Sequence, residues 1–485
     1  MVVLRNGRTA DEFQKPDIYI EELDPVADDS GKNKDPKVMA IVGRFQKGPL
    51  DQLMDVTKLT FSKNAGAISP DYPGSMAAYA AFKSGVKRLI LVNVRGAGAA
   101  KASIILPNTN TEQAEDALKI TYKVPGAYGN LCTATVEDGR NAGTFKVILE
   151  GPSSEREIYD NLENLEQASE AINTNLSSEF EAEVLFSGED NNKLKNVPRA
   201  HLENGNDGSA PTALHYKGTS DSSGRKTGNE LLKTSIMATD IVYDTYVSDV
   251  ANAGLVKTAE DMNGFAYLSA DKGINVTSAI SLRSTFDSEF AHLAVGYAKS
   301  KSSGFVVPVA VYDCIAHVLS LTSDGTSGFW FEDVESVDLL LTDDDIEELT
   351  KNNVVCMWQQ INENRDLVYG LMNDYTLSKN PLLRQTYRRR VTSLIEQELY
   401  VALTPYRSKH MSPAFEEDIE IKMRDFFNIK KEDEIIEDYQ LKFADYGTSS
   451  NLDEFIRDIK VNLYNIADKI IIRLLSATNA ITNEE

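Results

Sequence analysis

Two extended stretches near the ends of the chain constrain its fold more than any other feature. Residues 18–23 form a short apolar run between Pro16 and Pro25, a pattern typical of a single strand. Residues 459–463 alternate apolar and polar side chains, residues 465–468 are turn-forming, and residues 470–475 are mostly β-branched and apolar, which together predict a C-terminal β-hairpin. A lone strand leaves its backbone donors and acceptors open, so it has to pair with something. It can complete the chain's own sheet or add to the sheet of a neighbouring molecule, and the pattern leaves both alternatives open.

Size and charge place the chain among large globular proteins with an acidic surface. The chain has 485 residues, enough for about three domains, and 42% hydrophobic residues can supply a sizeable core. The formal net charge is −24. This balance argues against direct nucleic-acid binding, which needs a basic face, and against adsorption to an anionic membrane.

The cysteines and the apolar runs indicate the compartment. Cys132, Cys314 and Cys356 show no zinc or redox spacing, which indicates reduced thiols in a protein assembled in a cytosol. Residues 1–8 lack the apolar centre of a signal peptide. Because no run of about 18 apolar residues occurs, we expect no membrane insertion.

The order of predicted elements indicates an α/β (mixed α+β) protein. Strands at 38–45 and 88–94 flank an alanine-rich helix at 75–84, which is a βαβ unit. Residues 102–205 are richer in short alternating segments, with one helix expected at 159–175. The α/β alternation then resumes, with helices expected at 228–239, 247–263, 278–285 and 308–322 and strands at 240–243, 265–269, 292–297 and 353–358. Helices at 384–403 and 413–427 and a strand at 439–443 precede the terminal hairpin.

Five segments follow from this order. We expect an N-terminal linking arm (1–35), the first part of an α/β core (36–101), a β-rich inserted domain (102–205), the second part of the core (206–378), and a C-terminal α/β domain with a terminal linking strand (379–485).

The chain lacks the motifs of common enzymes, so we expect no catalytic residue, cofactor or metal. The five histidines, His201, His215, His292, His317 and His410, have no ligand spacing in the sequence. The glycines at 96–98 only weakly resemble a phosphate-binding loop, and the acids at 343–348 are more typical of a capped helix start than of a cation site. A hydrolase would require a pocket that gathers His292 or His317 with carboxylates.

Four arginines, Arg384, Arg388, Arg389 and Arg390, fall on what we interpret as the polar side of the helix at 384–403. Such a cluster is either a solvated face or a surface for docking an acidic partner.

Several segments in order resemble the contractile tail sheath proteins of phages and related injection particles. Residues 16–23 (PDIYIEEL) are similar to the family's PGVYVEE arm, and residues 38–49 (VMAIVGRFQKGP) to its AFVGxxxxGP segment. The similar segments further along are 78–94 (family FFxNGGxxxxVVRV), 124–131 (PGxWGN), 159–162 (xENL), 202–208 (LxGGxDG) and 388–399 (VRRxxxxIExxL). Residues 368–377 depart from the family's Pro/Gly-rich RTLS segment, which leaves the subfamily open.

The resemblance implies a non-enzymatic subunit of a contractile sheath, a homo-oligomer of stacked rings around a tail tube. The C-terminal α/β domain would be completed by exchanged terminal strands. The residues implied in this exchange are Ile18, Tyr19, Ile20, Leu23, Ile470, Ile471, Ile472 and Leu474. The four arginines become candidates for the tube contact. Baseplate and tail terminator proteins would be further partners, in the tail of a virion or tail-like particle assembled in the bacterial host cytoplasm. A surface-layer or shell subunit is the alternative.

Overall fold

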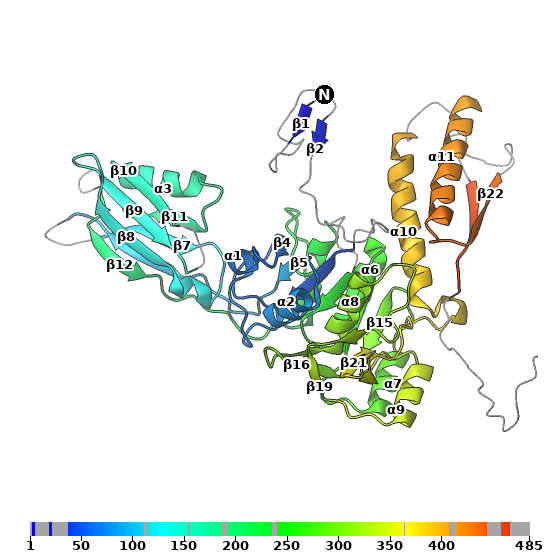
Figure 1. Cartoon of the computed structure of the whole chain (residues 1–485). Coiled ribbons are helices and arrows are strands. Elements are labelled where there is room, and N and C mark those ends of the chain that lie inside the picture. Colours follow the sequence, from blue (N-terminus) through cyan, green and yellow to red (C-terminus); the bar gives the residue numbers. More distant parts are fainter. Residues whose placement is uncertain are drawn as a thin grey trace, which may run out of the picture. The chain divides into compact units, whose positions relative to one another are not determined.

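The chain folds as two compact units, and each is described by itself. The first comprises residues 1–35 and 420–464, and the second comprises residues 36–419 and 465–485. The computed structural model describes residues 2–4, 19–21, 37–110, 115–152, 156–186, 188, 192–234, 240–362, 364–406, 413–443 and 457–465. Figure 1 shows the elements with the labels that are used below.

A six-stranded sheet forms the centre of the second unit, in the order β15-β14-β13-β3-β5-β4. Its strands are β3 (Met39–Gly43), β4 (Met54–Thr57), β5 (Arg88–Asn93), β13 (Asp240–Tyr243), β14 (Phe265–Ser269) and β15 (Ala291–Ala294). All neighbouring pairs are parallel except β4 with β5. Every residue of β3, β13, β14 and β15 is buried, because helices cover both faces of the sheet.

Alternate strand residues face two separate hydrophobic clusters. Met39 and Ile41 pack with helices α2 (Pro73–Ser84) and α8 (Val309–Leu319), whereas Ala40 and Val42 pack on the other face. The helices of that other face are α5 (Asn229–Leu232), α6 (Asp249–Met262), α7 (Val276–Ser284) and α9 (Asp343–Lys351). The period of two in a strand produces this division. Helices α2, α6 and α8 are labelled beside the sheet in Figure 1. The α/β core predicted from the sequence is confirmed.

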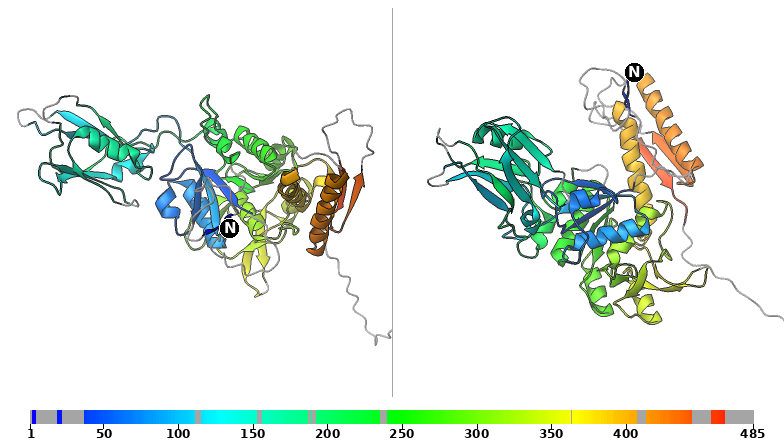
Figure 2. Two further views of the ribbon diagram at one scale, coloured as in Figure 1. Left: turned by 90° about the horizontal axis from the view of Figure 1, so that it is seen from above. Right: turned by 60° about the vertical axis from the view of Figure 1, so that its left-hand side comes forward.

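The segment between β5 and β13 contains two antiparallel sheets around their own hydrophobic cluster (Figure 2). One sheet has the order β11-β7-β6, with β6 (Ser103–Pro107), β7 (Asp116–Tyr122) and β11 (Phe180–Val184). The other has the order β10-β9-β8-β12, with β8 (Thr133–Asp138), β9 (Phe145–Glu150), β10 (Glu157–Leu162) and β12 (Val197–His201). The sequence prediction of a β-rich segment agrees with this arrangement.

The prediction of a helix at 159–175 is wrong for the first residues of this range. Residues up to Leu162 pair with β9 as strand β10, and helix α3 begins only at Leu165 and ends at Thr174. Asn161 has φ +59°, which an α-helix does not tolerate, and the Asn164 side chain caps the helix by accepting from the Gln167 backbone N–H.

Smaller elements complete the second unit. The strands β16 (Tyr297–Ser300), β17 (Val306–Pro308) and β19 (Val334–Val337) form one sheet, and β18 (Trp330–Phe331), β20 (Met357–Ile361) and β21 (Leu367–Leu371) form another. The strand expected at 292–297 is two strands, because Gly296 with φ +92° breaks it between β15 and β16. The helix expected at 228–239 is described only as α5, and residues 235–239 lie outside the described part. The remaining short helices are α1 (Phe61–Ala65) and α4 (Ala213–Lys217).

Helix α10 (Thr386–Leu403) begins on the core and buries Tyr387, Arg390, Val391, Leu394 and Ile395. The amphipathic helix predicted at 384–403 is therefore confirmed to within two residues.

The first unit contains most of helix α11 (Pro413–Glu432) and the antiparallel pair β22 (Asp438–Phe443) and β23 (Arg457–Asn462). Phe427 of α11 stacks on Tyr439 of β22, with ring centroids 5.1 Å apart. The strand expected at 459–463 therefore exists, but its described partner is β22. The second strand of the expected hairpin, at 470–475, lies outside the described residues.

The N-terminal strand predicted at 18–23 is described as β2 (Tyr19–Glu21). It is not a lone strand as expected, because it pairs in parallel with β1 (Val2–Leu4) and so satisfies one of its two edges.

Candidate functional site

The central sheet has a topological switch point between β3 and β13, where the chain leaves the sheet in opposite directions. In open α/β sheets this point, at the carboxyl ends of the strands, is the usual place for a ligand. Here Asp244 occupies it, accepting hydrogen bonds from the Arg44 backbone N–H at 2.9 Å and from the Tyr216 hydroxyl at 2.7 Å. A Cβ on Gly43 would lie 2.4 Å from Asp244 Cγ, so the strand end and the carboxylate are in close contact. Burial raises the pKa of Asp244 to about 6.

Gly96 and Gly98 lie at the joint where the core connects to the inserted segment. Their segment makes backbone contacts there with residues 206–209. Ala97 accepts from the Ser209 backbone N–H, and Ala100 pairs with Asn206. A Cβ on Gly96 would lie 2.0 Å from the Ser209 carbonyl oxygen. The two connecting strands therefore approach too closely for a side chain at this position.

Asp207 organises the polar contacts of this joint. It accepts a hydrogen bond from the Tyr72 hydroxyl at 3.0 Å and from the Ala127 backbone N–H at 3.2 Å, and it lies 3.6 Å from Arg95 Nε. Burial and the nearby Asp207 carboxylate raise the pKa of Tyr72 to about 12. A second ion pair, between Lys47 and Glu179 at 2.6 Å, also joins the core to the inserted segment.

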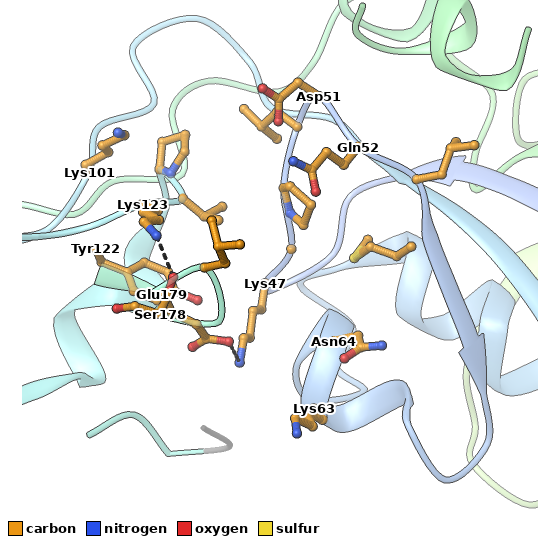
Figure 3. Close-up of a pocket in the computed structure, with 18 of the residues that line it drawn as sticks. Lys47, Asp51, Gln52, Lys63, Asn64, Lys101, Tyr122, Lys123, Ser178 and Glu179 are labelled. Atoms are coloured by element: carbon orange, nitrogen blue, oxygen red, sulfur yellow. Dashed lines mark hydrogen bonds and ion pairs between the residues drawn. The ribbon is translucent and has the colours of Figure 1, made fainter. Parts of the chain in front are cut away.

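A cleft of about 770 Å³ lies beside this joint (Figure 3). Its walls come mainly from residues 47–55 of the core and from residues 122–125, Leu176, Ser178 and Glu179 of the inserted segment. Its lysines are engaged: Lys123 donates to the Ser178 carbonyl at 2.7 Å, and Lys101 pairs with Glu181. The described lining residues include neither a histidine nor a cysteine, so the lining lacks the usual nucleophile–base pair.

Three titratable residues from two elements, β15 and α8, lie close together in the core. His292 of β15 and Asp313 and His317 of α8 offer ligand atoms within 4.8 Å of one another, and all three are buried. His292 Nδ1 is 2.9 Å from Asp313 Oδ2, and His317 Nδ1 is 3.2 Å from Asp313 Oδ1. We expected the histidines to have no ligand spacing, but Asp313 and His317 are one helical turn apart, which is the signal that could have indicated this cluster.

The environment of the cluster sets its protonation. Burial lowers the pKa of His317 to about 4. Burial also acts to raise the pKa of Asp313, but the two histidines outweigh it and lower that pKa to about 2. All three side chains are packed inside the core, with at most 2% of each exposed.

A second buried network lies next to this cluster. Arg390 of α10 forms an ion pair with Asp240 of β13 and donates to the Tyr267 hydroxyl at 2.6 Å and the His317 carbonyl at 3.4 Å. Asp240 is fully buried and Arg390 is 9% exposed. This pair fixes α10 to the central sheet.

The four arginines predicted as one polar face have different surroundings. Arg390 lies on the buried side of α10, so its placement on the polar side was wrong; its charge is compensated inside by Asp240. Arg389 pairs with Glu289 and Glu396, Arg384 stacks on the Tyr375 ring at 3.8 Å, and Arg388 donates to Asn465 at 2.7 Å. A role of any of them in contacting a tube stays a prediction.

The predicted exchange residues are described only in part. Tyr19 and Ile20 belong to β2, whereas Ile18, Leu23, Ile470, Ile471, Ile472 and Leu474 lie outside the described residues. Strand exchange therefore stays a prediction.

Three further sequence predictions can be compared with the structure. The acids at 343–345 begin helix α9, where Thr342 and Asp345 form a reciprocal capping box. Cys132, Cys314 and Cys356 are free and buried. In the described part of the chain, no helix combines the length and the apolar character needed to cross a membrane.

Comparison with known proteins gives matches at the level of structure. No protein-family model and no curated protein sequence matches the chain. A sheath tail protein from Listeria innocua superposes with a TM-score of 0.64 at 12% identity, over 89% of this chain and 96% of that one. A sheath tail protein from Desulfitobacterium hafniense gives 0.56 at 12% identity, over 86% and 93%. The helical sheath of the anti-feeding prophage in its contracted state gives 0.53 at 11% identity, over 96% and 99%.

These matches span nearly the whole of each chain, and so include both the core and the segments on either side of it. The resemblance expected from the sequence motifs is confirmed for the fold: this chain has the fold of the contractile tail sheath proteins.

Proposed function

We propose that the chain is the structural subunit of a contractile tail sheath, which polymerises as stacked rings around a tail tube and contracts to drive the tube through a target cell envelope. The observation that carries the proposal is the agreement of fold with sheath proteins over 86–96% of this chain. Fold alone does not determine function, so the proposal also needs physical support from the chain itself.

The terminal segments supply that support. The first unit has two described two-stranded sheets, β1-β2 and β22-β23, and each of β22 and β23 has one edge that no other described strand pairs. A two-stranded sheet is marginally stable alone and gains from added strands. Strands containing Ile18–Leu23 and Ile470–Leu474 of neighbouring copies would add to these edges by backbone hydrogen bonding. For the N-terminal arm, β2 would use its second edge or give up its pairing with β1.

Such donated strands make a head-to-tail contact that does not close on itself, and this kind of contact generates helical assemblies. The partners we propose are therefore other copies of the chain, a tail tube, and baseplate and tail terminator proteins. The expected location is the tail of a virion or tail-like particle, assembled in the bacterial host cytoplasm.

We propose no enzymatic activity. Asp244 and Tyr216 fill the ligand position of the sheet, and the His292–Asp313–His317 cluster is enclosed in the core. Both sets of groups have structural partners, which supports a scaffold role. For tube contact, Arg388 is the best of the four arginines. It is partly exposed and no ion pair to an acidic side chain is described for it, whereas Arg384, which also has none described, stacks on the Tyr375 ring and donates to the Thr350 carbonyl.

Electron microscopy of the purified chain beside a version lacking residues 1–24 tests the proposal. We expect tubes or stacked rings from the full chain, alone or with a co-expressed tube protein, and monomers from the truncation. Flat sheets or closed shells from the full chain would instead indicate a surface-layer or shell protein. Tubes from both versions would keep the sheath and reject the N-terminal arm as its link.

A charge reversal at Arg388 tests the tube contact separately. Arg388→Glu should weaken assembly on the tube, while Arg424→Glu, on an exposed side of α11, serves as a matched control of equal charge change. Equal assembly of both variants would remove Arg388 from the tube surface.

A further inference from the structure

The cleft beside the joint carries an excess of positive charge in a strongly acidic chain. Its lining contains five basic and three acidic side chains, whereas the whole chain has a formal net charge of −24. The bases are Lys47, Lys63, Lys101, Lys123 and Arg225. Two other clefts, on the inserted segment, have no such excess: their linings have two bases against three acids, and two against two. The cleft is therefore a locally positive surface on a negative molecule.

The basic side chains of the cleft differ in how far solvent can reach them. Lys47 and Lys123 hold the joint together through the contacts described above. The Arg225 side chain is 59% exposed and pairs with the partly exposed Asp51 at 2.9 Å. Such an exposed pair is weak, so Arg225 can exchange its partner for another carboxylate. Lys63 of α1 is also exposed, and Figure 3 shows it on the core wall of the cleft. An acidic partner can thus reach Lys63 and Arg225 from solvent.

Helix α9 presents a concentrated negative surface on the same unit. Five of the six residues at 343–348 are acidic. Asp345 is engaged in the capping box, whereas Asp343, Asp344, Glu347 and Glu348 are exposed. The second turn of the helix therefore directs two neighbouring carboxylates, those of Glu347 and Glu348, into solvent.

The positive cleft and the negative helix lie at opposite edges of the central sheet. The cleft is lined by Met54 and Asp55 of β4, which is one edge strand. Helix α9 belongs to the other edge, because Val355, just after the helix, pairs with Ala294 of β15. The labels α1, beside the cleft, and α9 stand well apart in Figure 1. One copy of the chain thus has complementary charges on two different sides.

This arrangement suits a contact between copies of the chain. Two copies of such high negative charge repel each other at long range, so a stable contact needs a local match of opposite charges. A match between two different surfaces on opposite sides of one subunit is head-to-tail, and it repeats from copy to copy. A contact between like surfaces would instead place acid against acid, or base against base.

We propose that the cleft binds the acidic face of α9 from a second copy of this chain, with Lys63 and Arg225 facing Glu347 and Glu348. The Arg225 guanidinium can hold a carboxylate through two parallel N–H donors. As a link between neighbouring sheath subunits, beside the donated strands, this contact rests on the proposed function.

Two charge-reversed variants of the full chain test the contact. The cleft variant combines Lys63→Glu with Arg225→Glu, and the helix variant combines Glu347→Lys with Glu348→Lys. All four side chains are exposed, and the capping box and first-turn acids of α9 are unchanged, so both variants should fold. Each variant alone brings like charges together at the contact. In a mixture of the two, an acidic cleft meets a basic helix, and a basic cleft meets an acidic helix.

Sedimentation velocity measures the association of each variant and of the equimolar mixture. The donated strands contribute equally to all samples. The mixture should associate at least about tenfold more tightly than either variant alone. Because the restored contact is made by exposed charges, raising the salt concentration from about 0.05 M to about 0.5 M should remove this difference.

The matched control is Glu417→Lys with Asp418→Lys, which reverses two exposed neighbouring acids at the start of α11. It has the same net charge as the helix variant, and its mixture with the cleft variant should associate no more tightly than the cleft variant alone. Equal association of the control mixture would show general charge attraction and overturn the proposal. An equimolar mixture of cleft and helix variants that associates no better than its components would overturn it as well.

Electron microscopy of the same samples separates this contact from the proposed function. Restored association in the mixture, with no tubes or rings even from the natural chain, would keep the contact and count against the sheath. Tubes from the natural chain, with no restoration in the mixture, would keep the sheath and reject the contact.

Discussion

Asp240→Asn is the substitution that best tests how α10 is held on the core. Asp240 is fully buried on β13 and forms an ion pair with Arg390, from a position 150 residues away in the sequence. The substitution keeps the shape of the side chain and removes its charge. Arg390 would keep its hydrogen bonds to the Tyr267 hydroxyl and the His317 carbonyl, but its charge would be buried without compensation.

Removing one partner of a buried pair costs about 3–5 kcal/mol, which is several times the value of an exposed pair. With a urea dependence of about 2–3 kcal/mol/M, the unfolding midpoint should fall by roughly 1–2 M. Trp330 and Trp358, the only two tryptophans, lie in β18 and β20 of the second unit, so their fluorescence follows unfolding of that unit.

Two comparisons make the result decisive. Asp261→Asn removes a partner of Lys233 that is 37% exposed, and should cost no more than about 1 kcal/mol. Asp240→Asn combined with Arg390→Met removes both charges and should recover much of the loss, because no uncompensated charge remains. A midpoint for Asp240→Asn equal to that of Asp261→Asn would refute the reasoning.

Three other predictions concern pH and the joint. Because burial lowers the pKa of His317 from 6.5 to about 4, its contribution to stability is complete above pH 6.5 and is lost as the pH falls towards 4; His317→Gln should remove up to about 3 kcal/mol of this dependence in urea titrations. Asp244 has the opposite sign: its pKa is raised from 3.8 to about 6, so the chain should gain up to about 3 kcal/mol relative to Asp244→Asn between pH 6 and 4. Gly96→Ala would place a Cβ 2.0 Å from a backbone oxygen and should lower the melting temperature of the chain strongly. Gly143→Ala should lower it much less, because the space around Gly143 is open and the only cost is about 1 kcal/mol for a side chain at φ +80°. Equal melting temperatures for the two glycine variants would contradict the close approach at the joint.

Local pattern was sufficient for much of the fold. Strands such as β3 and β5 are continuous apolar runs, and such runs indicate strands buried on both faces. Helix α9 has its cap, its first-turn acids and its last-turn lysine in the sequence. The ordered motifs that resemble sheath proteins predicted the fold, which the structural matches confirm.

The errors arose where partners outside the local window decided the outcome. Residues 159–162 were predicted as the start of a helix, but pairing with β9 and the left-handed Asn161 make them part of a strand. The strand at 459–463 pairs with β22, which the sequence analysis did not predict, while the expected pairing with 470–475 stays a prediction.

Sequence alone therefore determined most of the strands and helices of the core, because side-chain periodicity reports whether one face, or both, will be buried. Only the tertiary structure decided what the polar residues do. Arg390 looked like part of a solvated face and is a buried partner of Asp240, while His292, Asp313 and Thr386 meet from β15, α8 and α10. The physical reason is that a buried charge is stable only with a specific partner, and partners far apart in the chain are chosen by the packing of whole elements, which no local pattern records.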